Sequence, residues 1–555
     1  MARGGTLNLA GAAVAAVATV GATILVTRHF SRPVAGAFFT AISAFLILEA
    51  LAGLGANTGL VYFIARLRSL GEENRIPTIL RAAIIPVVVA SAATALTMLL
   101  LASPLAHLLL SGHLGHGAVE PVALAGALRV LALAIPFFAM VDTLLGATRG
   151  YREMRPTVFI YQMGIPGAQL LGIAFAVAAG SAALLAPLWA LPSVVAAAAA
   201  WLWLRRIRRG AGPPRGNVAD IMAAVPPELA ALLALSTPVT ASNGAPSGRP
   251  SSARRATRRG TRVSRKQLAN ANPRGFWKFT WPRAVASVGS IILQRLDIVL
   301  VAILKGPGWA AVYTAATRFL VVGQFGNMAI SRAAQPWFTE LFTLGDRRGT
   351  NTIYQATTAW LILLNWPLYL LAIVFGPEVL AVFGPSYRVG AAVMVILGFS
   401  MILGTACGQV DMVLITSGRS SWSLVNGLVA VSVNVGVDLL LIPKYGIIGA
   451  AIGWAAAMTT SNLLPLAQLG AIYRLHPFGP GTLIAAPLTA LSFGLVPLAA
   501  RAVLGGGAAS LAAGVAAGCA LQAAGLWRFR GPLELRTMPG LAVFRDRHRG
   551  RPGAN

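Results

Sequence analysis

The sequence has few charged residues and even fewer acidic ones. Only 11% of its 555 residues are charged and 56% are hydrophobic, whereas about a quarter of the residues of a soluble globular protein are charged. This excludes an ordinary soluble enzyme. It also excludes a nucleic-acid-binding protein, because basic soluble proteins are not this apolar. The composition predicts an all-α polytopic membrane protein.

Cysteine is scarce as well. Cys407 and Cys519 both lie in apolar runs, which excludes a disulfide framework and a thiolate metal site. Three histidines, His107, His113 and His116, lie near one predicted loop, but no cysteine or carboxylate cluster joins them. We therefore expect neither a metal site nor a cofactor.

Signatures of membrane enzymes are missing too. The chain has no Gly-x-x-x-x-Gly-Lys-Ser/Thr phosphate loop, which excludes a built-in ATPase. A glycosyltransferase that uses polyprenyl-phosphate sugars is expected to carry acidic residues in its first outer loop, but residues 28–36 contain none. These absences favour a transporter over an enzyme.

Long apolar runs, in contrast, are abundant. A helix needs roughly 20 apolar residues to cross the bilayer core. Fourteen segments meet this requirement: 7–27, 37–64, 82–102, 121–144, 156–180, 182–204, 279–304, 309–333, 352–376, 388–417, 421–442, 446–473, 481–504 and 507–527.

The basic residues predict the orientation of these spans. If the N-terminus is cytoplasmic, 34 of the 45 Lys and Arg residues fall on the cytoplasmic side and 6 on the outer side. Such an excess is expected, because cytoplasmic loops are enriched in Lys and Arg. The net charge of +29 thus reports mainly topology, with both termini in the cytoplasm.

A long break divides the spans into six and eight. The predicted units are an N-terminal six-helix lobe (1–204), a basic cytoplasmic linker (205–278), a second six-helix lobe (279–475), two further helices (476–527) and a basic cytoplasmic tail (528–555). Six is an even number, so both lobes enter the membrane from the same side; if they are structural repeats, they are parallel ones.

The linker is rich in Pro, Gly, Ser and Arg and has too little apolar content to form a core, so we expect it to be largely disordered. It either binds anionic lipid through its basic residues or is a solvated connection that only marks the cytoplasmic side. The short apolar run 230–235 is a candidate membrane contact. Thr257, Thr261 and Ser264 are candidate phosphorylation sites.

Several short motifs resemble those of a known family. They are LQRLDIVL at 293–300, AVYTAATR at 311–318, VFGPSY at 382–387 and LIPKYGIIGAA at 441–451, with GAFF at 36–39 near the start of the chain. In this order they resemble the polysaccharide-transporter branch of the multidrug/oligosaccharidyl-lipid/polysaccharide exporter superfamily. The likeness covers about residues 5–475 without the linker.

The resemblance implies a flippase that moves a polyprenyl-(pyro)phosphate-linked oligosaccharide from the cytoplasmic to the outer leaflet of a bacterial inner membrane. It implies two six-helix lobes around a central cavity that opens alternately to each side, and, as partners, glycosyltransferases or a polymerase of the same surface-polysaccharide pathway. The basic linker and the fourteen spans depart from relatives that have twelve. The lipid II flippase also has fourteen.

Ionisable residues inside spans are the first candidates for function, because they are costly in lipid and usually face the interior of the bundle. Arg295 and Arg318 lie on adjacent antiparallel spans, each about nine residues or roughly 13–14 Å from the predicted outer end. Arg129 lies at a similar depth in the first lobe. These three arginines are the predicted phosphate-binding residues, because the guanidinium fork matches phosphate oxygens and keeps its charge.

The carboxylates allow more than one interpretation. Asp297 either orients these arginines or forms a structural ion pair, since residues 295 and 297 are about 200° apart around a helix. Glu49 is either a proton- or Na⁺-coupling site or a partner for an arginine. Asp142, Asp411 and Asp438 lie near span ends, where solvation makes a structural role more frequent.

Two other functions remain open from the sequence. A cation-coupled antiporter of small molecules on the same fold would need a buried coupling carboxylate, for which Glu49 is the mid-depth candidate. A membrane scaffold without transport activity would depend on the basic linker and the Arg-rich tail instead of the intramembrane arginines.

Overall fold

The computed structural model describes residues 2–110, 119–210, 272–529, 531 and 533. In these residues, thirteen helical segments are long and apolar enough to cross a membrane. The one predicted span that is not among these thirteen, at 309–333, lies in the 38-residue helix α13 (Pro307–Leu344), which carries several polar residues. The prediction of an all-α membrane protein with about fourteen spans is confirmed. The predictions for the linker at 211–271, including its candidate lipid contact and phosphorylation sites, and for most of the tail lie outside the described residues.

The first group of helices corresponds to the predicted N-terminal lobe. It comprises α1 (Ala2–His29), α2 (Arg32–Ala52), α3 (Ala56–Ser69), α4 (Ile76–Leu109), α5 (Pro121–Gly150), the π-helix η2 (Thr157–Gly164), α6 (Ile165–Ala178), α7 (Leu185–Ala190) and α8 (Pro192–Gly210), with 3₁₀ turns at Glu73–Arg75 and Ala182–Leu184.

The second group follows the linker. It comprises α12 (Pro273–Lys305), α13, α14 (Arg347–Val374), α15 (Gly376–Ala381), the 3₁₀ turn η4 (Pro385–Gly390), α16 (Ala391–Ala406), α17 (Val410–Thr416), α18 (Ser420–Tyr445) and α19 (Ile447–Tyr473). The last two spans are α20 (Pro480–Ala490), the π-helix η5 (Leu491–Leu495) and α21 (Val496–Leu504), which together form one span, and α22 (Ala508–Arg528).

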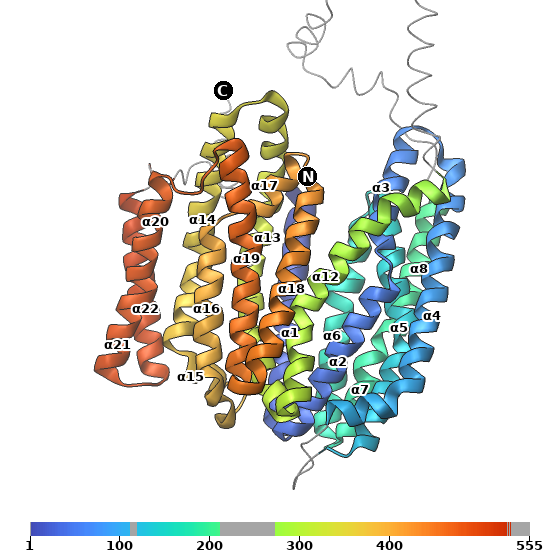
Figure 1. Ribbon diagram of the computed structural model, residues 1–555, viewed down its shortest axis with the longest axis horizontal. Helices are drawn as coiled ribbons and strands as arrows, with labels where there is room; N and C mark the ends of the chain where they lie inside the picture. The colour runs from blue at the N-terminus through green and yellow to red at the C-terminus, as the bar shows by residue number, and fades with distance from the viewer. Residues whose placement is uncertain (1, 111–118, 211–271, 530, 532, 534–555) are drawn as a thin grey trace, which may run out of the picture.

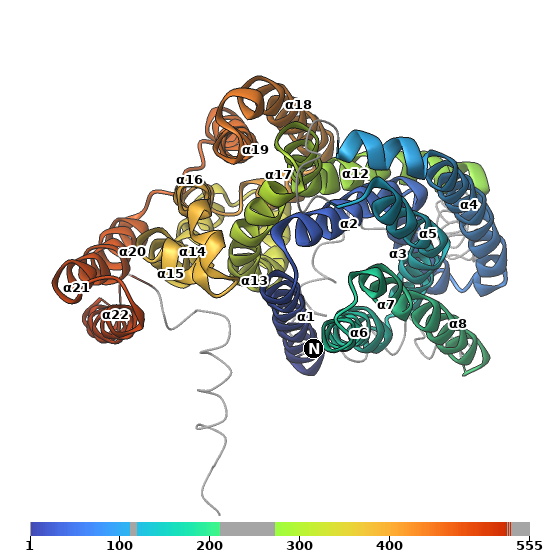
Figure 2. The same cartoon turned by 90° about the horizontal axis from the view of Figure 1, so that it is seen from below.

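Viewed along the helices, the two groups lie side by side, with α20–α22 at the far edge next to α14 (Figure 2). The start of α1, the end of α8 and the start of α12 lie at the same end of the molecule, the upper end in Figure 1. The sequence predicts that this end is cytoplasmic. Proline occupies the first turn of α2, α5, α12 and α13, where its missing N–H is not needed for a helical hydrogen bond.

The two groups are in close contact at the predicted outer end. Gly36 of α2 lies directly against the backbone carbonyl of Pro307, so that a Cβ atom at position 36 would overlap it. The Arg28 guanidinium donates a hydrogen bond through Nε to the Val382 carbonyl oxygen at 2.7 Å, and Arg32 stacks on the Trp309 ring with its guanidinium carbon 5.1 Å from the ring centre. These contacts close the space between the lobes at this end.

Helix α12 packs on both groups. Near its start, Phe276 packs against Phe63 with ring centres 5.6 Å apart, and the Trp277 indole N–H donates to the Ala82 carbonyl at 3.1 Å. Further along, α12 packs against α18 and α13. The predicted boundary at residue 279 therefore falls inside a helix that the two lobes share.

The second span is broken between α2 and α3. Leu54 and Gly55 have φ angles of 49° and 63°, in the left-handed region that ends a right-handed helix. A Cβ atom at Gly55 would lie 2.8 Å from Ala284 Cα, so α3 and α12 approach closely here. The break turns the first residues of α3 towards α5.

We expect Gly55→Ala to lower the midpoint of thermal unfolding in detergent. The left-handed φ costs about 1 kcal/mol for alanine, and overpacking against Ala284 adds about 1–3 kcal/mol. Gly71→Ala is the matched control, because Gly71 has a φ of 71° but nothing within 4 Å of the position that a Cβ atom would take, so only the first cost applies. Equal midpoints for the two variants would contradict a close α3–α12 contact.

Candidate functional site

Arg295 and Arg318 lie on the wall of one cavity between the lobes. The cavity has a volume of about 250 Å³. Its other walls come from α1, α2, α5, η2, α6 and α7 of the first lobe, through side chains that include Thr19, Phe38, Phe138, Tyr161, Gln169 and Trp189. The cavity therefore combines a mainly apolar and aromatic N-terminal wall with two cationic side chains from the second lobe.

The local fold brings these two arginines to one level. Helices α12 and α13 are antiparallel and are joined at Gly306, whose φ of 92° permits the tight turn. The two arginines lie 11 and 12 residues from Gly306, which is roughly 17 Å of helix. The two guanidinium groups therefore lie close together at one depth in the membrane, as the sequence predicts.

Neither arginine has a carboxylate partner in the part of the chain that the structure describes. Arg318 Nε is buried and makes no hydrogen bond. A buried cationic donor without a partner is costly, and two such groups side by side repel each other. An anion in the cavity would supply both the missing acceptors and the missing charge.

Asp297 is placed differently from its predicted position. It faces away from Arg295, into the second lobe, where it is 2% exposed and accepts a hydrogen bond from the Tyr313 hydroxyl at 2.7 Å. The Asp438 carboxyl group lies within hydrogen-bonding reach. The predicted orienting contact or ion pair with the arginines does not form, because the 200° between positions 295 and 297 sends the two side chains to opposite sides of α12.

A buried carboxylate pair results. Asp438 and Asn434, four residues apart on α18, are fully buried, and the Asn434 amide donates to Asp438 at 3.1 Å. Asp297, Asn434 and Asp438 each have one side-chain oxygen without a hydrogen-bond partner. Two buried carboxylates that lie close together repel each other, and a proton or a cation between them relieves this repulsion. Gly453 of α19 provides the room, since a Cβ atom there would overlap Asp438.

Arg129 is not part of the cavity. Its side chain is exposed on the outer face of the first lobe and donates to the Ser103 hydroxyl of α4 at 2.9 Å. The prediction that Arg129 joins the other two arginines at the phosphate is wrong in this geometry. The depth of Arg129 follows from the sequence, but the direction of its side chain around α5 does not.

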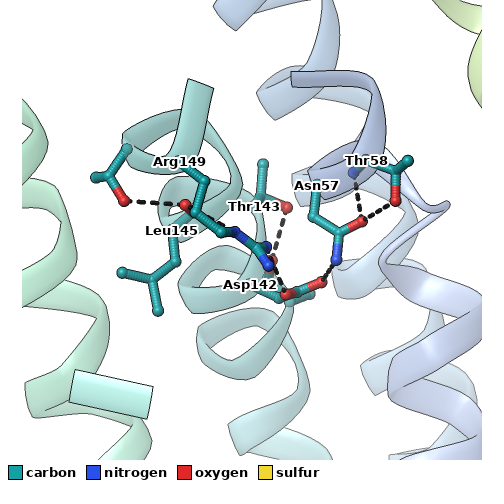
Figure 3. Close-up of polar contacts among 8 residues, drawn as sticks. Asn57, Thr58, Asp142, Thr143, Leu145 and Arg149 are labelled. Atoms are coloured by element: carbon teal, nitrogen blue, oxygen red, sulfur yellow. Dashed lines mark hydrogen bonds and ion pairs between the residues drawn. The ribbon is translucent and has the colours of Figure 1, made fainter. Parts of the chain in front are cut away.

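Glu49 lies in a second polar cluster, within the first lobe. It is close enough to Asp142 for their charges to interact. Asp142 accepts a hydrogen bond from the Asn57 amide at 2.5 Å and lies 3.7 Å from Arg149 Nη2 (Figure 3). The two interpretations of Glu49, coupling site and arginine partner, both stay open, although no arginine forms an ion pair with it in the described residues.

Sequence reasoning gives too little weight to some of these residues. Their positions near span ends suggest a structural role for Asp142 and Asp438. Tyr313 lies within the motif at 311–318, but nothing in that motif indicates that its hydroxyl group binds a carboxylate. The spacing of Asn434 and Asp438, one helical turn apart on one face of an apolar helix, is the available signal. In the described residues, no three His, Cys, Asp or Glu side chains are close enough to hold a metal ion together.

Comparison with known proteins adds two kinds of result. No protein-family profile matches the chain. Two curated proteins of Haloferax volcanii are similar in sequence: the probable low-salt glycan biosynthesis flippase Agl15, 20% identical over 203 residues, and the probable flippase AglR, 25% identical over 183 residues. The matches cover 36% and 31% of this chain and span 43% and 37% of the two relatives, less than half of each.

Solved structures match over nearly the whole chain. The lipid II flippase MurJ in an inward closed conformation superposes with a TM-score of 0.67 at 12% identity, covering 93% of this chain and 97% of its own. An inward-facing multidrug resistance MATE family transporter of the MOP superfamily superposes with a TM-score of 0.59 at 14% identity, covering 83% and 94%.

The chain is therefore a multi-pass membrane protein, and its fold is the one shared by the MurJ and MATE structures. The two curated proteins that it resembles in sequence are named as probable flippases. Both results agree with the family likeness of the motifs at 293–318 and 382–451.

Proposed function

We propose that this protein is a flippase that moves a polyprenyl-(pyro)phosphate-linked oligosaccharide from the cytoplasmic to the outer leaflet for the synthesis of a cell-surface glycan. The observation that carries the proposal is the pair Arg295 and Arg318, which lies on the cavity wall without a carboxylate partner among the described residues. The names of the relatives Agl15 and AglR support the same class of cargo.

The physical problem of such a transporter is to take an anionic, hydrated head group through an apolar layer. Fixed arginines lower this cost, because each guanidinium donates charge-assisted hydrogen bonds to phosphate oxygens and cannot lose its proton. The apolar and aromatic N-terminal wall, with Phe38 and Trp189, excludes bulk water from the cavity and strengthens these interactions. The polyprenyl tail would stay in the lipid.

The contacts between the lobes support alternating access. The predicted outer end is closed by Gly36 against Pro307 and by Arg28 on the Val382 carbonyl. Towards the predicted cytoplasmic end, a vestibule of about 840 Å³ separates α3, α5 and α12. This arrangement corresponds to a state that receives cargo from the cytoplasm, and breaking the outer contacts would release it on the other side.

Two energy sources fit the geometry. A membrane potential that is negative inside drives an anionic cargo outward, with about 2.3 kcal/mol per charge for each 100 mV. A gradient of protons or small cations is a second source, because the Asp297–Asp438 pair would bind and release a proton or a cation as the lobes move. If such a gradient drives transport, this pair, and not Glu49 alone, is the coupling site.

We place the protein in the cytoplasmic membrane of a bacterium, where glycosyltransferases and a polymerase of the same pathway would supply and consume the cargo. The basic linker and tail would contact anionic lipid on the cytoplasmic side. Neither a scaffold without transport activity nor a cation-coupled antiporter of small molecules would require unpaired intramembrane arginines.

The proposal is tested with the purified protein in liposomes and a fluorescent isoprenyl-diphosphate sugar whose leaflet is read by a quencher. We expect the wild-type protein to move the probe, and Arg295→Gln/Arg318→Gln to lose at least about 100-fold of the rate, because each charge-assisted hydrogen bond contributes about 1.5–3 kcal/mol. Arg129→Gln is the matched control, since Arg129 faces away from the cavity. Equal rates for the double variant and the wild type would overturn the phosphate role.

A further inference from the structure

A second cavity, the vestibule, lies at the predicted cytoplasmic end of the first lobe. It lies between α3, the end of α5 and the start of α12, with a volume of about 840 Å³. Eleven residues line it: Asn57, Thr58, Val61, Tyr62, Ala65, Arg66, Ser69, Leu70, Arg149, Arg152 and Phe279. It is distinct from the cavity that contains Arg295 and Arg318, because the two share no lining residue.

All the charged residues that line the vestibule are basic. Arg66, Arg149 and Arg152 line it, and none of its lining residues is acidic. The other polar lining groups are hydroxyls and one amide, which can donate hydrogen bonds to an anion. Three guanidinium groups around one water-accessible cavity form a binding site for a polyanion such as a phosphate or diphosphate.

The depth of the vestibule matches the position of lipid head groups. Arg149 lies one residue before the end of α5 and Arg66 three residues before the end of α3, the level at which helices leave the membrane. Asn57, at the inner end, lies twelve residues from the end of α3, which is roughly 18 Å of helix. A head group that enters at the membrane surface can therefore move along α3 to the middle of the bilayer.

Arg149 is held loosely at present. Its Nη2 lies 3.7 Å from Asp142, too far for a strong hydrogen bond, and its Nε donates to the Leu145 carbonyl of its own helix at 3.3 Å. Asp142 is bound more tightly on the other side, by the Asn57 amide at 2.5 Å (Figure 3). The carboxylate thus occupies the place where an incoming anion would meet Arg149.

Asp142 also connects the vestibule with the deeper cavity. Tyr161 lines the cavity of Arg295 and Arg318, and its hydroxyl group lies within electrostatic range of Asp142, Arg149 and Arg295. Asp142, which lies beside Arg149, is therefore linked through the field at Tyr161 to the cavity that contains Arg295. A negative charge at this position competes with a bound anion and would favour its release from Arg149.

We propose that the vestibule is a loading site for the diphosphate of an isoprenoid lipid, in which the phosphate replaces Asp142 on Arg149 before it moves on to Arg295 and Arg318. The inference rests on the proposed flippase function and deepens it: it assigns the first binding step to Arg149, Arg152 and Arg66 and the release from that step to Asp142.

The test uses the full-length protein in lipid nanodiscs, with farnesyl diphosphate as the probe and farnesol as the uncharged control. Binding is measured in the Arg295→Gln/Arg318→Gln background, so that only the vestibule contributes. We expect Arg149→Gln to weaken farnesyl diphosphate binding about tenfold or more and to leave farnesol binding unchanged. Arg348→Gln, which removes an exposed arginine at the same end of the second lobe, should change neither.

Asp142→Asn is expected to change the affinity for farnesyl diphosphate in the opposite direction to Arg149→Gln. It keeps a partner for the Asn57 amide but removes the competing charge, so we expect tighter binding of farnesyl diphosphate, by several-fold, and slower movement of the probe across the membrane in the background with both central arginines intact. A variant that merely disturbed the fold would weaken binding and transport together.

Two results would overturn the loading site and leave the proposed function standing. One is an unchanged affinity in Arg149→Gln while transport still requires Arg295 and Arg318. The other is equal displacement of farnesyl diphosphate by phosphatidylglycerol in the nanodisc, which would assign the vestibule to ordinary anionic lipid. Transport that did not require Arg295 and Arg318 would instead overturn their phosphate role, and a wild-type protein that did not move the probe would overturn the proposed function itself.

Discussion

A Gly36→Ala variant is expected to expose the central cavity at the predicted outer end. The added methyl group would overlap the Pro307 carbonyl, and this atom belongs to the backbone at the start of α13, so it cannot rotate away. Overpacking of this kind costs about 1–3 kcal/mol, which shifts the balance between the closed and open outer ends by roughly 5- to 150-fold.

The shift can be measured by thiol labelling in intact cells. Thr19→Cys places a reporter on the cavity wall, after both native cysteines, Cys407 and Cys519, are replaced by alanine. A membrane-impermeant maleimide should then react several-fold faster when Gly36→Ala is added. Gly436→Ala is the matched control, because its methyl group would meet nothing within 4 Å. Unchanged labelling in a correctly folded Gly36→Ala variant would contradict the closed outer end.

An Asp297→Asn variant is expected to fold normally but to lose any stimulation of transport by a proton or sodium gradient. The amide keeps the volume of the side chain and an acceptor for the Tyr313 hydroxyl, while it removes the charge that holds a proton or cation beside Asp438. A tenfold cation gradient supplies about 1.4 kcal/mol per cation, so a stimulation of about tenfold would disappear.

The measurement is transport into proteoliposomes with and without an imposed gradient, together with the midpoint of thermal unfolding. Asp297→Ala should lower that midpoint, because it removes the acceptor of the buried Tyr313 hydroxyl, at a cost of about 1–3 kcal/mol. Asp411→Asn, which changes an exposed carboxylate that is hydrogen-bonded to Ser423, should affect neither property. A normal response of Asp297→Asn to the gradient would exclude the pair as the coupling site.

The positions of the spans could be predicted from the sequence to within a few residues. For example, the run predicted at 121–144 is α5 (Pro121–Gly150), and the run at 446–473 is α19 (Ile447–Tyr473). This works because an apolar segment of bilayer length has few alternatives to a helix when its backbone must satisfy its own hydrogen bonds. Depth along a helix follows from the same count, as the shared level of Arg295 and Arg318 illustrates.

Directions around the helices could not be predicted in the same way. Arg129 has the expected depth but faces outward, and Asp297 points to the second lobe instead of the arginines. A membrane helix is apolar on all sides, so its sequence has no polar face that would indicate its rotation. Contacts between distant helices, such as Asn57 with Asp142, set the rotation, and these depend on the tertiary fold.

The break between α2 and α3 could not be predicted either. Gly53 and Gly55 flank Leu54 within an otherwise continuous apolar run, and glycine is tolerated inside membrane helices without a break. Here the close approach to Ala284 of α12 fixes the left-handed conformation. The consequence for the site is large, because the break turns Asn57 towards Asp142.

The packing of α12 determines where the basic linker is attached. The helix before the linker, α8, belongs to the first lobe, and the start of α12 is fastened to that same lobe by Phe276 on Phe63 and by the Trp277 indole on Ala82. Both anchor points would thus travel together whenever the lobes rock. A partner that bound the linker would therefore be attached to the first lobe at both ends and would not connect the two lobes.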